Sequence, residues 1–495
     1  MQVRLVAGST AVVSAVGAWI VSPRFSLGIP SLTDDWSAIR DAGAWISDYL
    51  HLDDPEPQRF RPGWVVWNYL QWHTLGAPAH MLGPNIWNVA RLAVLAAGVS
   101  LVTLLLIRPP PGGWPGRALQ AALVALPALL IVTTPGIAED LARFAPQEPA
   151  LLGSMLLGGS LLFLAARALV RGMPSWPIAG LLAAAGAVLW IFGAYQKETS
   201  ICAVVLLAAL RIANPSWWRR VRALELRRRL AVWSLAAVTI LPLAHVALMS
   251  LLIERRGALR YGETPQDWGY LHRTWHLVDE APSALRSITA PLLVVVAVVG
   301  VAVTVAVRRR ADWIPIGLVA TAAGTIVMSA QAGAVPSRYY LPTLALSFMT
   351  LSVLASRLAL RYQAVWVLLA GAAVLAYAGP ARSRVEKWAE YERAGARIVS
   401  EATRLEETGC PVALEGLYDE HMIALPYLVS LRTSGTGSCR DGSAYLVLGL
   451  ADSGARVEQA CTGASKPFVW TSVATVYRCD SLRPGVKTLV SDRSG

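Results

Sequence analysis

Long apolar runs constrain the fold of this chain more than any other feature of its sequence. A membrane-spanning helix needs about 20 mostly apolar residues, and runs of that kind begin near eleven positions before residue 380. These positions are residues 4, 85, 118, 148, 178, 198, 231, 286, 313, 338 and 363. Charged residues make up only 15% of the 495, against about 25% in soluble domains. The sequence therefore predicts a polytopic α-helical membrane protein with about eleven transmembrane helices.

The polar segments between the runs alternate between two kinds. One kind is short and basic, and the other is longer, mixed in charge and rich in Trp, His and Pro. The basic segments comprise residues 108–117, 171, 219–229, 308–310 and 357–361. Cytoplasmic loops carry an excess of Lys and Arg. This bias predicts a cytoplasmic N-terminus and, after an odd number of spans, an extracytoplasmic C-terminus.

The charge distribution also bears on partners and location. The net charge of +12 comes mainly from these short arginine segments, and no basic patch interleaved with aromatic residues is present. We therefore expect membrane lipids, and not nucleic acid, as a partner. The first run has a basic start, like a secretory signal, but no small-residue cleavage site follows it. We interpret it as a retained helix of a multi-pass plasma-membrane protein.

After about residue 380 the composition becomes that of a soluble domain. We therefore divide the chain into a transmembrane domain, residues 1–380, and an extracytoplasmic domain, residues 381–495. A charged helical segment at residues 384–407 leads into short alternating runs that are typical of β-strands. These runs lie at residues 411–414, 444–448 and 466–470. The pattern predicts a small C-terminal α/β domain.

Four of the five cysteines lie in this C-terminal part, namely Cys410, Cys439, Cys461 and Cys479. In an oxidising compartment, four cysteines in a small domain predict two disulfides. Three connectivities are possible, and we favour sequential pairing, Cys410 with Cys439 and Cys461 with Cys479. A zinc site is the alternative, although no C-x-x-C spacing is present.

The first long outer segment, residues 22–83, is too long to be a simple connector. It places Asp34 and Asp35 at the outer mouth of the first helix. A carboxylate at the edge of a bilayer is partly desolvated at a cost in free energy, so we expect this pair to perform chemistry. Farther along, Trp and Tyr residues at near-helical spacing in residues 64–73 predict an amphipathic interfacial helix. Those aromatic residues serve either to anchor the loop on lipid or to stack on sugar.

Charged residues also mark the second and third outer turns. Glu148 would begin the fourth run, where an interaction with the helix dipole accounts for it. Lys197 and Glu198 interrupt the hairpin between the fifth and sixth runs. They either mark the turn at the outer surface or face a cavity that binds an acidic or phosphate-bearing ligand.

Outer arginines oppose the charge bias and need a local reason. Arg255 and Arg256 open the loop after the seventh run, either to bind a lipid-linked phosphate or to form salt bridges within the loop. His272 lies in the same loop, four residues before His276, and two histidines alone are a weak metal signal. Arg338 stands just before a late helix, where a phosphate would be well received.

Taken together, these motifs resemble those of the GT-C membrane glycosyltransferases. The chain has an acidic pair after the first helix and the sequence Arg59-Phe60-Arg61-Pro62 in the first outer loop. It also has Lys197-Glu198 at a mid-chain outer turn and Arg338-Tyr339 before a late helix. The resemblance covers roughly residues 1–380. The Ala-, Arg-, Gly- and Trp-rich composition is also similar to that of actinobacterial proteins, which would suggest cell-wall arabinan or mannan chemistry.

The resemblance implies an enzyme that takes sugar from a polyprenyl-phosphate donor on the outer face and gives it to a glycan, glycolipid or protein acceptor. Asp34 or Asp35 would be the general base on the acceptor hydroxyl or a ligand of a divalent cation. Arg338 with Tyr339 would bind the donor phosphate. Lys197 and Glu198 would line the donor cavity. The C-terminal domain is much smaller than the modules of large arabinosyltransferases, so the resemblance assigns it no role.

By the same resemblance, Arg59 and Arg61 would order the first loop or bind substrate. A flippase or transporter of lipid-linked sugars is the main alternative function, and it would require charges deep inside the spans. A polymerase or ligase of surface glycans would share the outer arginines without needing the acidic pair. A structural envelope protein is a further alternative.

Overall fold

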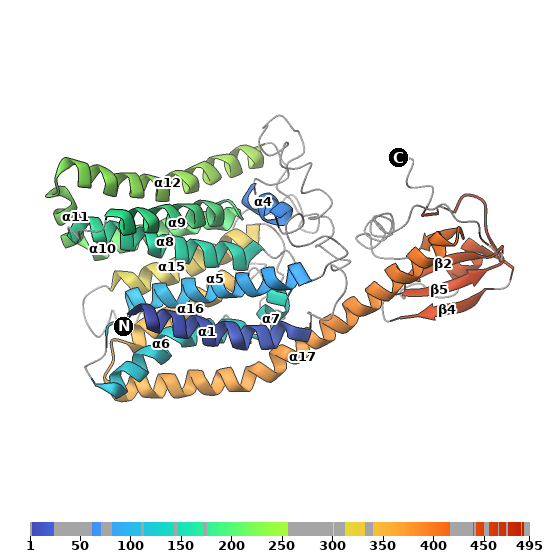
Figure 1. Cartoon of the computed structure of the whole chain (residues 1–495), viewed down its shortest axis with the longest axis horizontal. Helices are drawn as coiled ribbons and strands as arrows, with labels where there is room; N and C mark the ends of the chain where they lie inside the picture. The colour runs from blue at the N-terminus through green and yellow to red at the C-terminus, as the bar shows by residue number, and fades with distance from the viewer. Residues whose placement is uncertain are drawn as a thin grey trace.

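The computed structural model describes residues 2–23, 62–70, 82–109, 113–142, 147–171, 176–255, 300, 312–331, 340–415, 439, 442–449, 455–463, 465–471, 474–486 and 488–489. Most of the described chain forms a bundle of apolar helices (Figure 1). The long helices are α1 (Gln2–Val21), α5 (Leu82–Leu106), α6 (Trp114–Thr133), α8 (Gln147–Arg171), α9 (Trp176–Ala194), α10 (Ala203–Ala213), α12 (Leu226–Arg255), α15 (Trp313–Gln331), α16 (Leu341–Ala355) and α17 (Leu360–Glu407). Short helices are α4 (Pro62–Leu70), α7 (Pro135–Ala142), the 3₁₀ helix η3 (Glu198–Cys202) and α11 (Pro215–Arg222).

Seven of the described helices are long and apolar enough to cross a membrane, and the segment from Glu198 to Arg222, bent by 79°, would be an eighth if both of its arms belonged to one span. Helices α15 and α16 are apolar but shorter. Ten of the eleven predicted spans coincide with described helices, and the span expected near residue 286 lies outside the described residues. The prediction of a polytopic α-helical membrane protein is confirmed.

Close approach of small residues holds the centre of the bundle together. A Cβ added at Gly98 of α5 would lie 2.7 Å from the carbonyl oxygen of Gly153 in α8. A Cβ at Gly158 of α8 would lie 2.6 Å from the backbone nitrogen of Trp190 in α9. Only glycine permits these backbone contacts, which is the usual packing of helices in membranes, where dispersion contacts replace the hydrophobic driving force. Helices α5, α8 and α9 therefore form a tightly packed layer.

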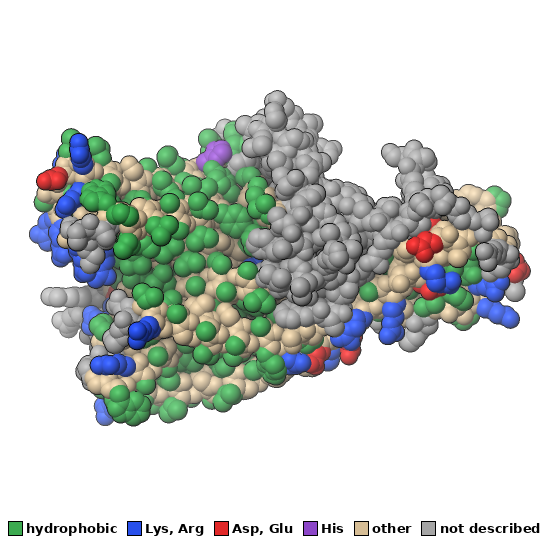
Figure 2. All heavy atoms as spheres, viewed as in Figure 1, with side chains coloured by type: hydrophobic (Ala, Val, Ile, Leu, Met, Phe, Trp, Pro, Cys, Tyr) green, Lys and Arg blue, Asp and Glu red, His purple; other side chains and the backbone are tan. Residues whose placement is uncertain are grey.

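The bundle has two unlike ends. The N-terminus lies at one end, here called the N-terminal end, and α17 leaves the bundle at the other, here called the domain-side end (Figure 1). Lys and Arg side chains gather at the N-terminal end (Figure 2). The described basic segments, which connect α5 to α6, α8 to α9, α10 to α12 and α16 to α17, share that end. The predicted sidedness of the arginines is thus seen in the fold, while the assignment of that side to the cytoplasm stays a prediction.

Helix α17 connects the bundle to a C-terminal α/β domain. Its 48 residues are continuous through Pro380, so the expected division at residue 380 is not marked by a break in the helix. Ala381 and Val385 still pack in the core of the bundle. From Ile398 onward, the apolar face of α17 packs against the sheet instead.

The sheet of this domain has the strand order β1-β2-β5-β4. The strands are β1 (Val412–Glu415), β2 (Ala444–Gly449), β4 (Lys466–Trp470) and β5 (Ala474–Cys479). Strand β1 pairs with β2 in parallel, and the other pairs are antiparallel. Side chains alternate between the face covered by α17 and a second face covered by α19 (Ala455–Ala460). The predicted strands are confirmed, and β5 is an addition that the sequence reasoning passed over.

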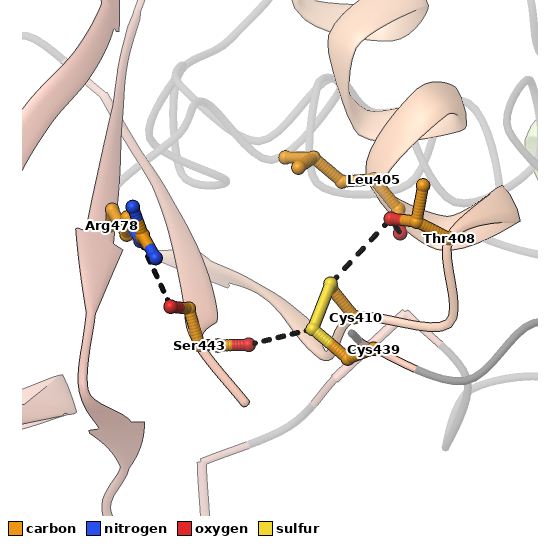
Figure 3. Close-up of a disulfide and its surroundings, with 6 residues drawn as sticks. All are labelled: Leu405, Thr408, Cys410, Cys439, Ser443 and Arg478. Carbon is orange, nitrogen blue, oxygen red and sulfur yellow. Dashed lines mark hydrogen bonds between the residues drawn. A yellow bond between two sulfur atoms is a disulfide. The ribbon is translucent and has the colours of Figure 1, made fainter. Parts of the chain in front are cut away.

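The two predicted disulfides are present, Cys410 with Cys439 and Cys461 with Cys479. The first joins the turn after α17 to the residues that precede β2 (Figure 3). Beside it, the Thr408 hydroxyl donates to the Leu405 carbonyl at 2.7 Å and so closes the end of the helix. The Arg478 guanidinium donates to the Ser443 hydroxyl at 2.9 Å. The zinc alternative is not supported, because all four cysteines are used in these bonds.

Candidate functional site at the domain-side end of the bundle

Most of the predicted site residues fall outside the part of the chain that the structure describes. These are Asp34, Asp35, Arg59, Arg61, Arg256, His272, Arg338 and Tyr339. Arg255 is the last residue of α12. Lys197 and Glu198 are described, and they lie where α9 ends and η3 begins. The candidate site is therefore built from the region around Lys197.

Lys197 forms a buried ion pair with Glu148. The Lys197 ammonium donates to Glu148 Oε1, and each residue is 3% exposed. Lys197 therefore does not mark an exposed turn, and Glu148 does more than interact with the dipole of its own helix. Because a buried charge is costly unless it is paired and hydrogen-bonded, the two residues hold each other in place.

The local fold explains how two residues so distant in sequence meet. Glu148 lies in the first turn of α8. At the end of α9, the Gln196 backbone N–H donates to the Gly193 carbonyl at 3.1 Å, which closes a tight turn. Lys197 follows with an extended backbone, φ −162° and ψ 151°, before η3 starts. Since α8 and α9 pack closely, with Gly193 of α9 beside Leu151 of α8, this turn carries Lys197 to the first turn of α8.

Two unsatisfied polar side chains adjoin the ion pair in sequence. Gln196 is 0% exposed, and among the described residues neither the oxygen nor the nitrogen of its side-chain amide has a hydrogen-bond partner. The Thr199 hydroxyl is also buried, with no partner in the part of the chain that the structure describes. Most buried polar groups in proteins are hydrogen-bonded, and an unpaired one costs about 1–3 kcal/mol. Such an amide beside a buried ion pair is suited to receive the hydroxyl groups or phosphate oxygens of a ligand.

Helix α4, from the first long loop, docks on this same turn. The Gly63 N–H donates to the Tyr195 carbonyl at 3.0 Å, and the rings of Trp67 and Phe192 lie 5.5 Å apart. A helix is confirmed over residues 64–70 of the predicted stretch 64–73, whose last three residues lie outside the described residues, and the Trp67 ring packs against protein. The first loop, which carries Asp34 and Asp35, is thus tied to the Lys197 turn.

Tyr195 links the turn to α12. Its phenol lies 2.8 Å from His245 Nδ1, within hydrogen-bonding distance. Burial raises the pKa of the Tyr195 phenol above its ordinary value. The phenol therefore stays protonated at neutral pH and can donate to the histidine.

A second group of buried polar side chains lies at the same end, and the sequence reasoning missed part of it. Arg91 of α5 donates to the Asn88 side chain and, at 3.3 Å, to the Leu141 carbonyl of α7. Asn88 donates to the Ala142 carbonyl at 3.2 Å. Asp140 of α7 is 3% exposed. An arginine inside a predicted apolar run was the signal that could have identified this group.

Helix α17 forms side-chain contacts with α7 and α1 at this end of the bundle. Arg384 forms an ion pair with Glu139 of α7 at 2.8 Å. Arg382 donates to the Trp19 carbonyl of α1 at 2.7 Å and stacks over the Trp19 ring. The C-terminal domain is therefore attached to the end of the bundle that carries the buried charges. Over the described residues, no cluster of three His, Cys, Asp or Glu side chains is arranged to hold a metal ion.

These features define the chain as a polytopic helical membrane protein with a disulfide-bonded α/β domain and buried charges at one end of its bundle. No protein-family model matches the chain, and no curated protein matches it in sequence. Among solved structures, it is similar to the crystal structure of ArnT from Cupriavidus metallidurans in the apo state, at 13% identity. The match covers 96% of this chain and 97% of that one, with a TM-score of 0.49. At that score, the similarity by itself assigns neither a family nor a function.

Proposed function

We propose that this protein is an integral membrane glycosyltransferase of the GT-C type. It would transfer a sugar from a polyprenyl-phosphate-linked donor to an extracytoplasmic acceptor, which is a cell-envelope glycan, a glycolipid or a protein. The observation that carries the proposal is the group of buried charges at the domain-side end. Arg91, Asp140, Glu148 and Lys197 are each at most 3% exposed, among helices whose buried residues are mostly apolar. The motif resemblance of residues 1–380 supports the same assignment.

In this proposal, the donor lipid lies among the helices with its phosphate near Lys197 and Arg338. The first-loop carboxylate, Asp34 or Asp35, removes the proton from the acceptor hydroxyl, which typically contributes about 10²–10⁴-fold to the rate. The acceptor oxygen bonds to the anomeric carbon while the bond from that carbon to the phosphate oxygen breaks. The leaving group departs as a lipid phosphate whose charge is stabilised by the cations. A single displacement of this kind inverts the anomeric configuration.

The absence of charges along several described helices favours this reading over a flippase. A pathway that carries a charged headgroup across the midplane requires polar or charged groups inside the spans. Helices α9, α15 and α16 contain no Asp, Glu, Lys or Arg. The charged side chains of the other described spans lie toward their ends, with Arg91 bonded to the end of α7. Chemistry at one end of the bundle agrees better with this distribution.

The decisive experiment is sugar transfer by the purified protein. The wild type and the Asp34→Asn, Asp35→Asn and Arg338→Ala variants would be assayed with a panel of polyprenyl-phosphate sugars, with and without EDTA. We expect one Asp variant to lose at least 100-fold in transfer while it still binds donor. Sensitivity to EDTA would assign the carboxylates to a divalent cation instead of to base catalysis. If the folded wild type binds these donors and never transfers sugar, the enzyme proposal fails and a flippase takes its place.

A further inference from the structure

Helix α11 lies across the N-terminal end of the bundle. The chain bends by 79° between α10 and α11, at the dipeptide Asn214-Pro215. If α10 runs along the membrane normal, a helix bent by this much lies close to the membrane plane. Such an orientation is typical of interfacial helices with aromatic residues on one side and basic residues on the other.

The aromatic side of α11 is fixed against neighbouring spans. The rings of Trp217 and Phe163 in α8 are 5.7 Å apart, and those of Trp218 and Trp233 in α12 are 5.8 Å apart. The guanidinium of Arg211 lies 4.6 Å from the centre of the Trp218 ring. Tryptophan prefers the level of the lipid headgroups, so these contacts set α11 at that depth.

The other side of α11, with the adjacent start of α12, forms a basic surface that we call the arginine patch. Its members are Arg219, Arg220, Arg222, Arg227, Arg228 and Arg229. Arg219, Arg220 and Arg222 are exposed. Within the described chain, no carboxylate forms an ion pair with any member, and Glu225 is the sole acidic residue between residues 211 and 229. Figure 2 shows the basic side chains gathered at this corner.

Beside the patch, one face of the start of α12 is apolar. Leu226, Leu230 and Trp233 are 60%, 56% and 50% exposed. Unpaired cations therefore lie at the headgroup level, with an exposed hydrocarbon surface beginning next to them. An anionic phospholipid has the same order of groups, with a phosphate above and acyl chains below. A nucleic acid or a soluble acidic protein would use the cations but would leave the apolar surface uncovered.

We propose that the arginine patch is a binding site for anionic phospholipid headgroups of the leaflet on the N-terminal side. The site lies at the opposite end of the bundle from the candidate active site and does not depend on sugar transfer. Each basic residue near an anionic surface strengthens binding about fivefold. Loss of three exposed members should therefore weaken binding by a factor on the order of 100, and by at least about tenfold.

The test uses the full-length protein in detergent, titrated with phosphatidylglycerol or phosphatidylcholine, with bound lipids counted by native mass spectrometry. The wild type should bind phosphatidylglycerol more tightly, and sodium chloride should reduce that preference because salt screens exposed charges. The triple variant Arg219→Gln, Arg220→Gln, Arg222→Gln should lose the preference. Thermal unfolding of each variant establishes that it is folded.

Two controls make the result specific. The triple variant Arg108→Gln, Arg117→Gln, Arg361→Gln removes the same charge from exposed residues at the same end of the bundle. Because these three residues lie outside the patch, this variant should lose much less affinity for phosphatidylglycerol than the patch variant does. Glu225→Gln should raise the affinity by about two- to fivefold, a gain that misfolding cannot produce. Equal losses in both triple variants, or no loss in the patch variant, would overturn the proposal.

Discussion

The pair of Glu148 and Lys197 offers the sharpest test of how the candidate site is built. Both residues are 3% exposed, so removal of one partner leaves the other buried without its counter-charge. Breaking a buried pair in this way typically costs about 3–5 kcal/mol, whereas replacement of both partners by neutral groups is often close to neutral. We expect Lys197→Met and Glu148→Gln each to destabilise the bundle. The double variant should be more stable than the sum of the two effects predicts by at least about 2 kcal/mol.

The chain contains its own reporter for this measurement. Cys202 is buried and is the one free cysteine of the five, because the other four form disulfides. It lies in η3, only five residues after Lys197. A thiol-reactive fluorophore therefore reports the opening of this part of the bundle during heating. Each single substitution should lower the midpoint by at least about 5 °C, and the double variant should recover much of that loss.

Activity should not follow stability in the double variant. If Lys197 contacts the donor phosphate, the double variant regains thermal stability and stays inactive. The ion pair of Asp312 and Arg357 is a matched control, since it is largely buried and Arg357 lies in the connection from α16 to α17, which the fold places at the N-terminal end. Arg357→Met should destabilise the protein to a similar degree and spare the turnover of the fraction that stays folded. Strictly additive stability effects, or a double variant that regains full activity, would refute this account of Lys197.

Three further predictions concern the surroundings of the site and the C-terminal domain. Gly63→Ala should detach α4 and lower transfer activity, because the new Cβ would lie 2.8 Å from the Phe192 carbonyl oxygen. The control is Gly180→Ala, whose Cβ would have nothing within 4 Å and which should add about 0.5–1 kcal/mol of stability. Gln196→Leu should raise the thermal-unfolding midpoint reported by Cys202 labelling, because it removes an unsatisfied buried amide. It should also weaken donor binding measured by titration. A lower midpoint would contradict this prediction. Cys410→Ser with Cys439→Ser opens a loop with a sequence separation of 29 and should cost the domain about 3–4 kcal/mol, seen as faster proteolysis of the C-terminal part than in the wild type. Unchanged proteolysis would mean that the sheet is stable without the bond.

The sequence predicted the helices well because the bilayer imposes a length on them. Hydrocarbon thickness requires about 20 apolar residues per span, and no tertiary information is needed to count them. Strands β1, β2 and β4 were predicted from alternation and the disulfides from the number of cysteines, whereas β5 was missed. The sharp bend before α11 had a local signal that was not used. A proline disfavours helical backbone in the preceding residue, and Asn214-Pro215 lies at the bend.

The site was less predictable because its contacts are long-range. Glu148 and Lys197 were each noticed, but each had an adequate local explanation as a helix-dipole residue or a turn residue. Their pairing spans 49 positions and follows from the packing of α8 against α9, which no local pattern encodes. The burial of Gln196 has the same origin. It is an ordinary turn residue by sequence, and the docking of neighbouring helices makes it an unsatisfied group.

The attachment of the C-terminal domain follows from the same arrangement. Helix α17 runs without interruption from Leu360 to Glu407, so no flexible linker separates the bundle from the sheet. It crosses the domain-side end with Arg384 bonded to Glu139, the residue before the buried Asp140. A change in the orientation of the domain would therefore be transmitted through α17 to α7, the helix that carries the buried Asp140 of the candidate site. Since the first loop docks through Gly63 on the Lys197 turn, both the loop that carries the predicted base and the C-terminal domain converge on the end of the bundle where the buried charges lie.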